Sequence, residues 1–519
     1  MTAPDTSIGI VLASFAEPPD RFAITYQHGG WTYRELLKHI HRAARAPHGH
    51  GIGRGDALAL ATGADPTTFA LRFAANVLGC ATTVLYDDLA SPVLADMLRY
   101  VEPAAVIVDP AHDPDRVFAA IEQAPAAAVW ALGEYPSTVN VADAIDTEPA
   151  QPTDIQAQPE DLSSIRLTDG STGIPKGIPQ NSAPPAYFDP NYLKGWNHTQ
   201  LICTAIGHLG DQLAEVVVTA GGRVVLQHEA SNPAQVLDAI EPEQITFIWM
   251  QPAMLHQILD DPALATTDTS SLRSMTITGG PSTPERIVQA LDRFGPIITQ
   301  GYGAYETGQI TLLTPPEHQR RELLTSVGRP VPGVQVSIAT GLMTGCYKQP
   351  DHTVEAMHEG WYHTGDLGFL DTEGYLSVVG RSKDTIVDVH ETVHPAHVEK
   401  VRHRHLRIQQ AAVFGITNGH DRDEKIAAAI VPTPPHRLHV DEVADWVRTE
   451  LRSAYTPEVV LLLDHMPTTG SNKPDRIMLR QLATESTTNQ SPAPDTSPSD
   501  SMSPTRNPNS TKITHHARR

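Results

Sequence analysis

Short apolar strands alternate with helical segments at the start of this chain, and this alternation constrains its fold more than any other feature. Residues 22–26 and 55–61 read as strands, because each contains a short apolar run beside turn residues. Between them, Thr32 and Glu35 have the spacing of a capping box, which marks the start of a helix. A second apolar helix is predicted over residues 67–77. This order of elements predicts an α/β fold in which helices cover the faces of a sheet.

The length of the chain predicts more than one domain. At 519 residues it is too long for one ordinary domain. We predict a large N-terminal domain of several α/β subdomains over residues 1–382. The turn at residues 380–384 is followed by a small α+β domain, which we place at residues 383–482. Residues 483–519 are rich in Ser, Thr, Pro and Asn, and we expect disorder there because they cannot bury enough apolar surface to fold.

Composition and charge limit where the protein works and what it binds. No run approaches the ~20 apolar residues of a membrane span, and the first residues lack the pattern of a secretory signal. The three cysteines, Cys80, Cys203 and Cys346, are scattered, which favours a reducing cytoplasm. The formal net charge of −22 argues against nucleic acid as a partner, because its phosphates would be repelled.

Residues 168–177, Thr-Asp-Gly-Ser-Thr-Gly-Ile-Pro-Lys-Gly, carry the densest set of anion-binding groups in the chain. Glycines allow backbone N–H groups to approach an anion closely, and hydroxyls and a lysine add donors and positive charge. The stretch differs from the common P-loop, because Pro175 and Gly177 flank Lys176 and disfavour a helix there. We interpret it as a phosphate-binding loop; a solvated turn is the alternative.

Turns rich in glycine also follow two later predicted strands. The strand at residues 275–278 leads into residues 279–282, and the strand at residues 297–300 leads into residues 301–306. Ligands of open α/β sheets bind at the carboxyl ends of strands. These two turns are therefore further candidates for a ligand site.

Taken together, these stretches resemble the ordered motifs of the adenylate-forming superfamily, which includes acyl- and aryl-CoA ligases, peptide-synthetase adenylation domains and luciferases. The resemblance covers roughly residues 8–480. Its motifs are residues 32–36, 168–177, 279–281, 302–306, 362–366, 380–381 and 470–473. Each match is modest by itself, and their common order is what makes the resemblance specific.

The resemblance implies a two-step reaction and a small C-terminal lid that rotates between the steps. In the first step a carboxylate attacks the α-phosphorus of ATP and gives an acyl-adenylate and pyrophosphate. In the second step the acyl group passes to a thiol or an amine. ATP and Mg²⁺ are the implied cofactors, with CoA or the phosphopantetheine of a carrier protein as a possible acceptor.

The resemblance also assigns roles to individual residues. The phosphate-binding residues would be Thr168, Gly170, Ser171, Thr172, Gly173 and Lys176. The residues around the adenine would be Gly279, Gly280, Pro281, Tyr302, Gly303 and Tyr305. The remaining residues would be Glu306 for Mg²⁺, Asp366 and Arg381 for the ribose, Lys473 for catalysis, His208 as the gate of the acyl pocket and Lys383 as the hinge.

Each of these residues has an ordinary structural alternative. Glu306 and Lys473 fit solvated loops, Asp366 fits a turn cap and Arg381 fits a surface ion pair. His208 fits a core histidine whose ring is satisfied. Asp211, three residues further on, suits a helix cap as well as a place near the acyl pocket.

This sequence departs from the superfamily pattern in four places. Asp169 puts a carboxylate into the phosphate loop, and Tyr305 stands where threonine is usual, so the longer phenol must take a different position. The segment at residues 334–347 is short for the β-hairpin region expected there. Val389 and His390 stand where a glycine usually lines the pantetheine tunnel. From this bulk we hypothesise an amine or a specialised carrier as acceptor rather than free CoA.

Residues 390–394 spell His-Glu-Thr-Val-His, the pattern of a zinc protease helix. The chemistry requires a helix, but Pro395 follows directly and disfavours one, and residues 385–389 read as a strand. We therefore reject a metalloprotease.

The sequence predicts an ATP-dependent carboxylic acid ligase that transfers the acyl group to a thiol. The acid is expected to be aryl or medium-sized acyl, because Leu209 follows His208 where amino-acid-selecting domains carry aspartate. One alternative is an amide synthetase, and another is a nucleotide-binding protein without turnover, which Asp169 and Tyr305 suggest.

Overall fold

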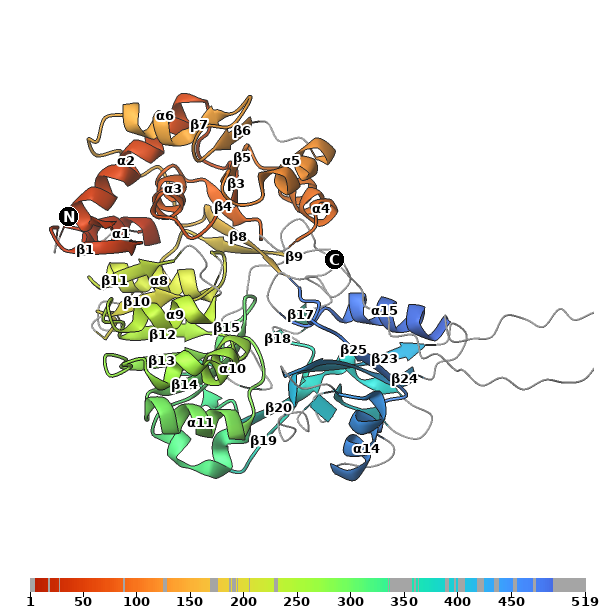
Figure 1. Cartoon of the computed structure of the whole chain (residues 1–519). Helices are drawn as coiled ribbons and strands as arrows, with labels where there is room; N and C mark the ends of the chain where they lie inside the picture. The colour runs from red at the N-terminus through yellow and green to blue at the C-terminus, as the bar shows by residue number, and fades with distance from the viewer. Residues whose placement is uncertain are drawn as a thin grey trace, which may run out of the picture.

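The computed structural model places a large N-terminal part and a small C-terminal part side by side (Figure 1). It describes residues 5–488 except for 17–18, 28, 87–88, 125–127, 169–175, 186–187, 189–192, 194, 205, 228–231, 335, 337–356, 359–360, 363, 388–391, 396–397, 400–406, 418–423, 434–437, 451–454 and 470–472. Within that part of the chain, no helix is long and apolar enough to cross a membrane.

The first large sheet has seven strands in the order β7-β6-β5-β3-β4-β8-β9. Its strands are β3 (Ala57–Ala61), β4 (Ala81–Val84), β5 (Ala105–Val108), β6 (Ala128–Ala131), β7 (Val139–Asn140), β8 (Leu162–Thr168) and β9 (Lys176–Asn181). The helices that alternate with them are α3 (Pro66–Val77), α4 (Ser91–Val101), α5 (Pro114–Gln123) and α6 (Val141–Thr147). Neighbouring strands are parallel except for the antiparallel pair β8–β9 at the edge.

The second large sheet has nine strands in the order β16-β15-β14-β13-β12-β10-β11-β1-β2. Its strands are β1 (Phe22–Tyr26), β2 (Gly29–Thr32), β10 (Thr199–Ile202), β11 (Arg223–Leu226), β12 (Phe247–Met250), β13 (Ser274–Ile277), β14 (Ile298–Ala304), β15 (Gly308–Leu313) and β16 (Arg329–Pro330). The associated helices are α1 (Ser7–Ser14), α2 (Tyr33–Gly49), α8 (Leu209–Thr219), α9 (Pro233–Ile240), α10 (Pro252–Asp260) and α11 (Pro284–Phe294), with the short 3₁₀ helices η2 (Pro262–Ala265), η3 (Glu317–Gln319) and η4 (Arg321–Thr325).

The two sheets share one apolar core. Leu60 of β3 and Phe69 of α3 belong to the same buried cluster as Ile202 of β10 and Phe247 of β12. The hydroxyl of Tyr33, fully buried at the start of α2, donates to the backbone oxygen of Val218 in α8 at 2.9 Å. A shared core fixes the two sheets relative to each other, so side chains from both contribute to one site.

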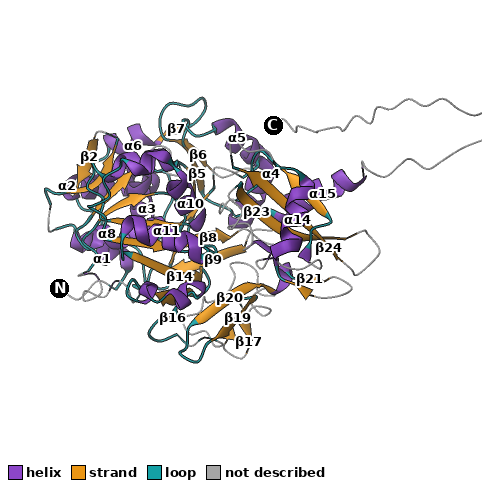
Figure 2. Ribbon diagram, turned by 60° about the horizontal axis from the view of Figure 1, so that its bottom comes forward, coloured by secondary structure: helices purple, strands orange, loops and turns teal. Residues whose placement is uncertain are grey.

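The C-terminal part has its own sheet and its own core. The sheet has three strands, β23 (Ile408–Thr417), β24 (Glu424–Pro432) and β25 (Val459–Leu462), and β21 (Ile386–Val387) and β22 (Thr392–Val393) form a separate pair. The helices are α14 (Val440–Glu450) and α15 (Arg476–Thr488). The pair β19 (Asp366–Leu370) and β20 (Leu376–Arg381) runs between the two parts, followed by the 3₁₀ helix η5 (Ser382–Asp384) (Figure 2). The short pair β17 (Met357–His358) and β18 (Trp361–Tyr362) precedes it.

The predicted α/β fold with a small second domain is confirmed, and so is the capping box. The backbone N–H of Thr32 donates to Glu35 at 2.8 Å, and the N–H of Glu35 donates to the Thr32 hydroxyl at 3.3 Å. The division of the chain after residue 382 falls within η5 and stays a prediction.

The predicted start of the tail at residue 483 is wrong, because α15 continues to Thr488. Leu479 and Ala483 are one helical turn apart and are both fully buried in the C-terminal core, against Phe414 of β23. Two apolar positions at this spacing anchor the helix beyond the point where the composition turns polar. Residues 489–519 lie outside the described part of the chain.

Candidate active site

The predicted phosphate loop is flanked by two paired strands. Thr168, the last residue of β8, lies opposite Lys176, the first residue of β9, in the antiparallel ladder. The prediction that no helix begins at Lys176 is confirmed. A side chain at Gly177 would come within 2.8 Å of the Tyr100 ring, so glycine allows this close packing. The residues between the strands, which include the predicted Gly170, Ser171, Thr172 and Gly173 as well as Asp169, lie outside the described residues.

The predicted glycine turn at residues 279–282 lies at the carboxyl end of β13, which is parallel to its neighbour β14. The prediction of a turn from residue 301 is wrong, because residues 301–304 continue β14 through their pairing with β15, and the turn begins at Tyr305. Gly279 has a φ of +88°, a conformation that favours glycine, and Gly280 and Pro281 follow it as exposed residues. At Gly303, an added Cβ would lie 2.3 Å from the backbone oxygen of Gly308 in β15. The backbones of β14 and β15 therefore approach each other closely at Gly303.

Asp366 is held from two sides by groups of different elements. It pairs with Arg381 across the β19–β20 ladder, and Arg381 Nε donates to Asp366 Oδ1 at 3.0 Å. The hydroxyl of Tyr302, from β14, donates to Asp366 Oδ2 at 2.5 Å. Burial, with the neighbouring Asp366 carboxylate, raises the pKa of Tyr302 above its ordinary value, so this phenol remains a donor. The structure thus brings together three predicted nucleotide-binding residues.

Glu306 is half-buried in the turn between β14 and β15. One carboxylate suits Mg²⁺, which binds proteins through few carboxylates and takes its other ligands from phosphates and water. Among the described residues, no group of three or more His, Cys, Asp or Glu side chains could hold a metal ion.

Tyr305, which precedes Glu306, points its ring toward Arg166 of β8. The guanidinium carbon of Arg166 lies 5.6 Å from the centre of the Tyr305 ring, the geometry of a cation–π contact. The Tyr305 side chain thus contacts β8, the strand that leads into the phosphate loop.

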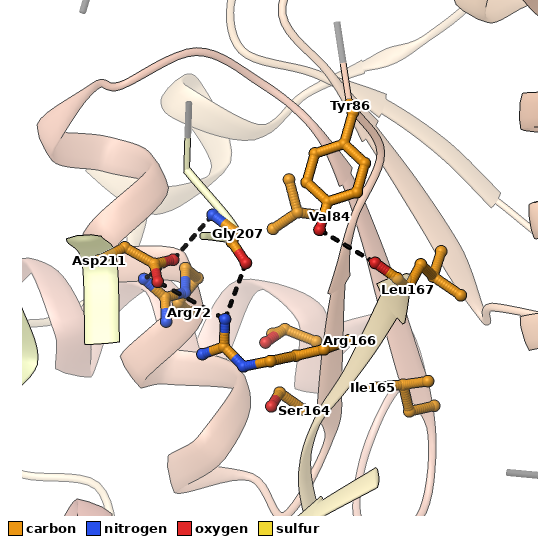
Figure 3. A pocket seen from close by; sticks show the side chains of 10 residues that line it. Arg72, Val84, Tyr86, Ser164, Ile165, Arg166, Leu167, Gly207 and Asp211 are labelled. Carbon is orange, nitrogen blue, oxygen red and sulfur yellow. Dashed lines mark hydrogen bonds and ion pairs between the residues drawn. The ribbon is translucent and has the colours of Figure 1, made fainter. Parts of the chain in front are cut away.

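His208 is buried and immediately precedes α8. Its ring stacks on Tyr86 with centroids 4.9 Å apart and planes 10° apart. The Tyr86 hydroxyl donates to the backbone oxygen of Leu167 at 3.1 Å, as Figure 3 shows. His208 is thus a packed histidine whose neighbour is tied to the end of β8, one residue before Thr168.

Asp211 lies in the first turn of α8, where it accepts a backbone hydrogen bond at the helix start, and its place near the acyl pocket stays a prediction. Its Oδ2 accepts from the backbone N–H of Gly207 at 2.9 Å and lies 2.9 Å from the guanidinium of Arg72 in α3. Its Oδ1 lies 3.7 Å from Arg166 Nη1, and within the described structure this buried oxygen has no hydrogen-bond partner. Asp211 therefore links the start of α8, which packs with the nine-stranded sheet, to Arg72 and Arg166 of the seven-stranded sheet and its helices.

A cavity of about 20 Å³ lies beside this ion cluster, which is enough for about one water molecule. Its lining comes from α3, from β4 and the residues after it, from β8 and from the start of α8 (Figure 3). The lining residues are Arg72, Thr82, Val84, Tyr86, Ser164, Ile165, Arg166, Leu167, Gly207 and Asp211.

The sequence analysis missed the two arginines of this cluster. One signal was present: Arg166 stands between two apolar residues, Ile165 and Leu167, two residues before the phosphate loop. A charged residue at such a place needs a buried partner. The signal at Arg72, within helix α3, was weaker, because a helix offers solvated faces on which arginine is common.

The predicted hinge residue, Lys383, lies in η5 between the two parts of the chain. Desolvation lowers its pKa, and the positive charges of Arg381, Lys176 and Arg476 lower it further, against the opposing effect of Asp384. The pKa of Lys383 is therefore lowered both by Lys176 of the phosphate loop and by Arg476 of the C-terminal part.

The predicted catalytic lysine, Lys473, lies in the C-terminal part, in the loop between β25 and α15. Its side chain is exposed, and its backbone oxygen accepts from the N–H of Thr469 at 2.7 Å. Residues 470–472, which complete the motif, lie outside the described residues.

The histidine pattern of a zinc protease does not lie on a helix in the part that can be described. Strands β21 and β22 pair antiparallel on either side of residues 388–391, which lie outside the described residues. The predicted strand before the pattern is confirmed at Ile386–Val387. The departures at Val389 and His390 lie outside the described residues, as does most of the short segment at 334–347.

Two family models match this chain, one over most of the N-terminal part and one over the C-terminal part. Residues 12–353 match the family model of the AMP-binding enzymes, and residues 397–473 match the model of the AMP-binding enzyme C-terminal domain. The chain therefore belongs to the AMP-binding enzymes, and it is an ATP-dependent, adenylate-forming ligase.

Its relatives differ in the acyl acceptor that their names imply. A feruloyl-CoA synthase from Amycolatopsis sp is 29% identical over 477 residues, which are 87% of this chain and 94% of the relative. The amide bond synthetase McbA from Marinactinospora thermotolerans is 28% identical, with a TM-score of 0.78 over 92% of this chain and 99% of the other. A fatty acid–[acyl-carrier-protein] ligase from Streptomyces coeruleorubidus is 26% identical over 87% of this chain and 91% of the relative.

Proposed function

We propose that this enzyme activates an aryl or medium-sized carboxylic acid as its adenylate and transfers the acyl group to a thiol, either CoA or the phosphopantetheine of a carrier protein. The observation that carries the proposal is the convergence on Asp366, which accepts from Tyr302 on one large sheet and from Arg381 at the entrance to the C-terminal part. A carboxylate held in this way is a fixed acceptor for the ribose hydroxyls of a nucleotide.

The roles of the other residues follow from where charge develops. Negative charge builds on the phosphates as the carboxylate attacks, and donors fixed in advance lower the barrier. Thr168 and Lys176, with the hydroxyls of the phosphate loop, hold the β- and γ-phosphates. Glu306 holds Mg²⁺, which supplies positive charge to the phosphate oxygens. Lys473 bridges the substrate carboxylate and the α-phosphate.

The acid is recognised beside His208, which stacks on Tyr86, a residue that follows β4 and is hydrogen-bonded to Leu167 near the end of β8. Support for an aryl acid comes from the relative named feruloyl-CoA synthase, and support for an acyl acid from the fatty-acid ligase.

An amine acceptor is the second candidate. The specific support is the similarity to an amide bond synthetase, together with the bulky Val389 and His390 at the position that lines the thiol tunnel in the superfamily. With an amine as acceptor, the same adenylate gives an amide instead of a thioester.

Carboxylate-dependent exchange between ATP and pyrophosphate tests the first step. A panel of aryl, short-chain and medium-chain acids is assayed with the wild-type enzyme and with Lys473→Ala. We expect exchange with one class of acid and its loss in the variant, by about 10²–10³-fold for a group that acts on the transition state.

Product analysis with CoA, a carrier protein and a panel of amines then separates the two acceptors. A thioester supports the first proposal, and an amide formed in preference to a thioester supports the second. ATP binding without exchange for any acid would contradict both and would favour a nucleotide-binding protein without turnover.

A further inference from the structure

Arg166 is charged, yet it occupies a buried position. It lies on β8 between the buried side chains of Ile165 and Leu167, and its own side chain is only 7% exposed. Burying a charge is unfavourable unless the charge is paired and its N–H groups are hydrogen-bonded. The groups that contact Arg166 therefore indicate its role in the structure.

Those partners come from three other segments. Arg166 Nη1 donates to the backbone oxygen of Gly207 at 2.8 Å and lies 3.7 Å from Asp211 Oδ1 (Figure 3). Its Nε donates to Gln180 Oε1 of β9 at 3.1 Å. Its guanidinium lies against the ring of Tyr305, in the turn after β14. One side chain thus contacts both large sheets and the turn that begins α8.

Each contacted segment also carries a residue of the proposed site. Gly207 immediately precedes the acyl gate, and Tyr305 immediately precedes the proposed metal ligand. Strand β9 begins with the phosphate-loop lysine, and strand β8, on which Arg166 itself lies, ends with the phosphate-loop threonine. The site residues concerned are His208, Glu306, Lys176 and Thr168.

The ion cluster does not need Arg166 simply to neutralise Asp211. Arg72 already lies 2.9 Å from Asp211, closer than Arg166 does. Arg166 is the member of the cluster that extends across to Tyr305 and to the Gly207 backbone. What it adds is a fixed spacing between the acyl side of the site and the metal and phosphate side.

We propose that Arg166 is a positioning residue for adenylation, which holds the Gly207–His208 turn and the Tyr305–Glu306 turn in register with β8 and β9, the strands that flank the phosphate loop. The inference rests on the proposed function for the roles of His208 and Glu306. Because Arg166 touches none of the reacting atoms in this scheme, its loss should impair kcat and the use of Mg²⁺ more than the affinity for the acid.

The test compares Arg166→Met and Arg166→Lys with the wild-type enzyme. In the exchange assay, Arg166→Met should lower kcat by about 10–100-fold, the range expected when reacting groups are displaced by about 1 Å, with little change in the KM for the acid. Lysine keeps the charge but lacks the planar fork that serves Gly207 and Gln180 together, so Arg166→Lys should restore the activity only in part.

A second readout does not require turnover. The affinity for ATP is measured by calorimetry with and without Mg²⁺. In the wild-type enzyme Mg²⁺ should tighten ATP binding, and in Arg166→Met this gain should shrink about tenfold because Glu306 is no longer held in place. Tyr305→Leu should reduce the same gain, and the double variant should lose little more than the worse single variant, since both break one contact.

Arg223→Met is the matched control, because Arg223, like Arg166, lies on a strand and pairs with a carboxylate, that of Glu243, but contacts no site residue among its described partners. Arg223→Met should keep the wild-type kcat and Mg²⁺ response. Wild-type kcat and Mg²⁺ response in Arg166→Met would overturn the proposal, as would a loss explained fully by lower thermal stability. If Arg166→Met does not fold, Arg166→Lys and Tyr305→Leu decide the question by the same two readouts.

The two proposals can fail separately. If no acid supports exchange but the Mg²⁺ response of ATP binding is present in the wild type and lost in Arg166→Met, the positioning role stands and the proposed reaction fails. If exchange is found and Arg166→Met matches the wild type, the reaction stands and the positioning role fails.

Discussion

At the scale of single residues, the site is defined by charged groups that are held before they meet a ligand. Asp366 accepts from Tyr302 and Arg381, and Asp211 is held by Arg72 and by the Gly207 backbone. Both carboxylates sit at contacts between elements distant in sequence. Their effect on function is therefore testable by changing charge alone, with little change in size.

Changing Asp366 to asparagine should weaken ATP binding. Asparagine has nearly the same shape but carries no charge, so hydrogen bonds from the ribose and from Arg381 lose their ionic component. Hydrogen bonds to charged groups contribute about 1.5–3 kcal/mol, which corresponds to a loss of affinity of about 10–150-fold. Calorimetric titration with ATP measures it. Asp260→Asn, which alters a surface pair with Arg286, is the control and should bind ATP normally.

Glu215 should make stability depend on pH. Desolvation, with repulsion from Asp211, raises its pKa above the ordinary 4.5, although Arg72 and Arg166 oppose the shift. A carboxyl group whose folded-state pKa is raised stabilises the fold at low pH, and this contribution is lost as the pH rises through the folded-state pKa. The melting temperature of Glu215→Gln should therefore rise relative to that of the wild type between pH 4.5 and neutrality.

Glu317 provides a control of opposite sign. Burial acts to raise its pKa, but hydrogen bonds from Thr314 and Tyr375 prevail and lower it. Its stabilising contribution is present above the ordinary pKa and is lost as the pH falls. Glu317→Gln should therefore lose stability relative to the wild type as the pH rises from acidic values. Parallel pH curves for wild type and Glu215→Gln would contradict the assignment for Glu215.

At the scale of elements, local sequence patterns predicted those helices and strands whose formation depends on residues close together in the sequence. The capping box at Thr32 and Glu35 was predictable because both partners lie within one helical turn. The absence of a helix start at Lys176 was predictable from Pro175 and Gly177 on either side, whereas the strand found there was not predicted. Patterns of this range also gave the alternation of strands and helices, and hence the fold class.

Contacts between distant elements were beyond the reach of such patterns. The packing of Ala483 on the C-terminal sheet depends in part on β23, more than sixty residues earlier, so composition alone ended the domain too soon. The Arg166 contacts likewise join β8 to turns that only the assembled sheets bring together. Recognised motifs supplied most of the candidate site residues, but they gave no information on residues outside the motifs.

The end of α15 can be tested by truncation. A chain that ends at Thr488 keeps Ala483 in the C-terminal core, whereas a chain that ends at Leu482 removes it together with the last turns of the helix. We expect the first to melt like the full chain and the second to lose several degrees in the transition of the C-terminal part. Differential scanning calorimetry distinguishes them, and equal melting of both truncated chains would mean that the last turns add nothing to stability.

At the scale of the whole molecule, the two parts of the chain meet around η5. The N-terminal part supplies the candidate nucleotide residues and the C-terminal part supplies Lys473, so the full set of proposed groups depends on how the two parts approach each other. Lys383 lies at this junction and is influenced by charges from both sides.

Replacing Lys383 with proline should separate the two half-reactions. Proline fixes φ and limits the backbone change that a hinge requires. We expect Lys383→Pro to retain pyrophosphate exchange and to transfer the acyl group at least about tenfold more slowly, as rapid-quench measurement of each step would show. Lys383→Gln removes the charge but leaves the backbone free, so it should transfer normally. Equal slowing of both steps in Lys383→Pro would argue against a hinge at this position.

The charges around Lys383 also have a consequence for the order of events during turnover. Lys176 and Arg476 both repel the charge of Lys383, although Arg476 is also paired with Asp384 at 3.6 Å and with Glu399 at 2.9 Å. An anion between Lys176 and Lys383 would relieve the repulsion between these two lysines. The negative charge of the bound triphosphate would attract both parts of the chain, and the release of pyrophosphate would weaken this attraction at the junction. Chemistry and domain motion would then be timed by the same departing anion, and added salt, by screening the repulsion, would weaken that coupling.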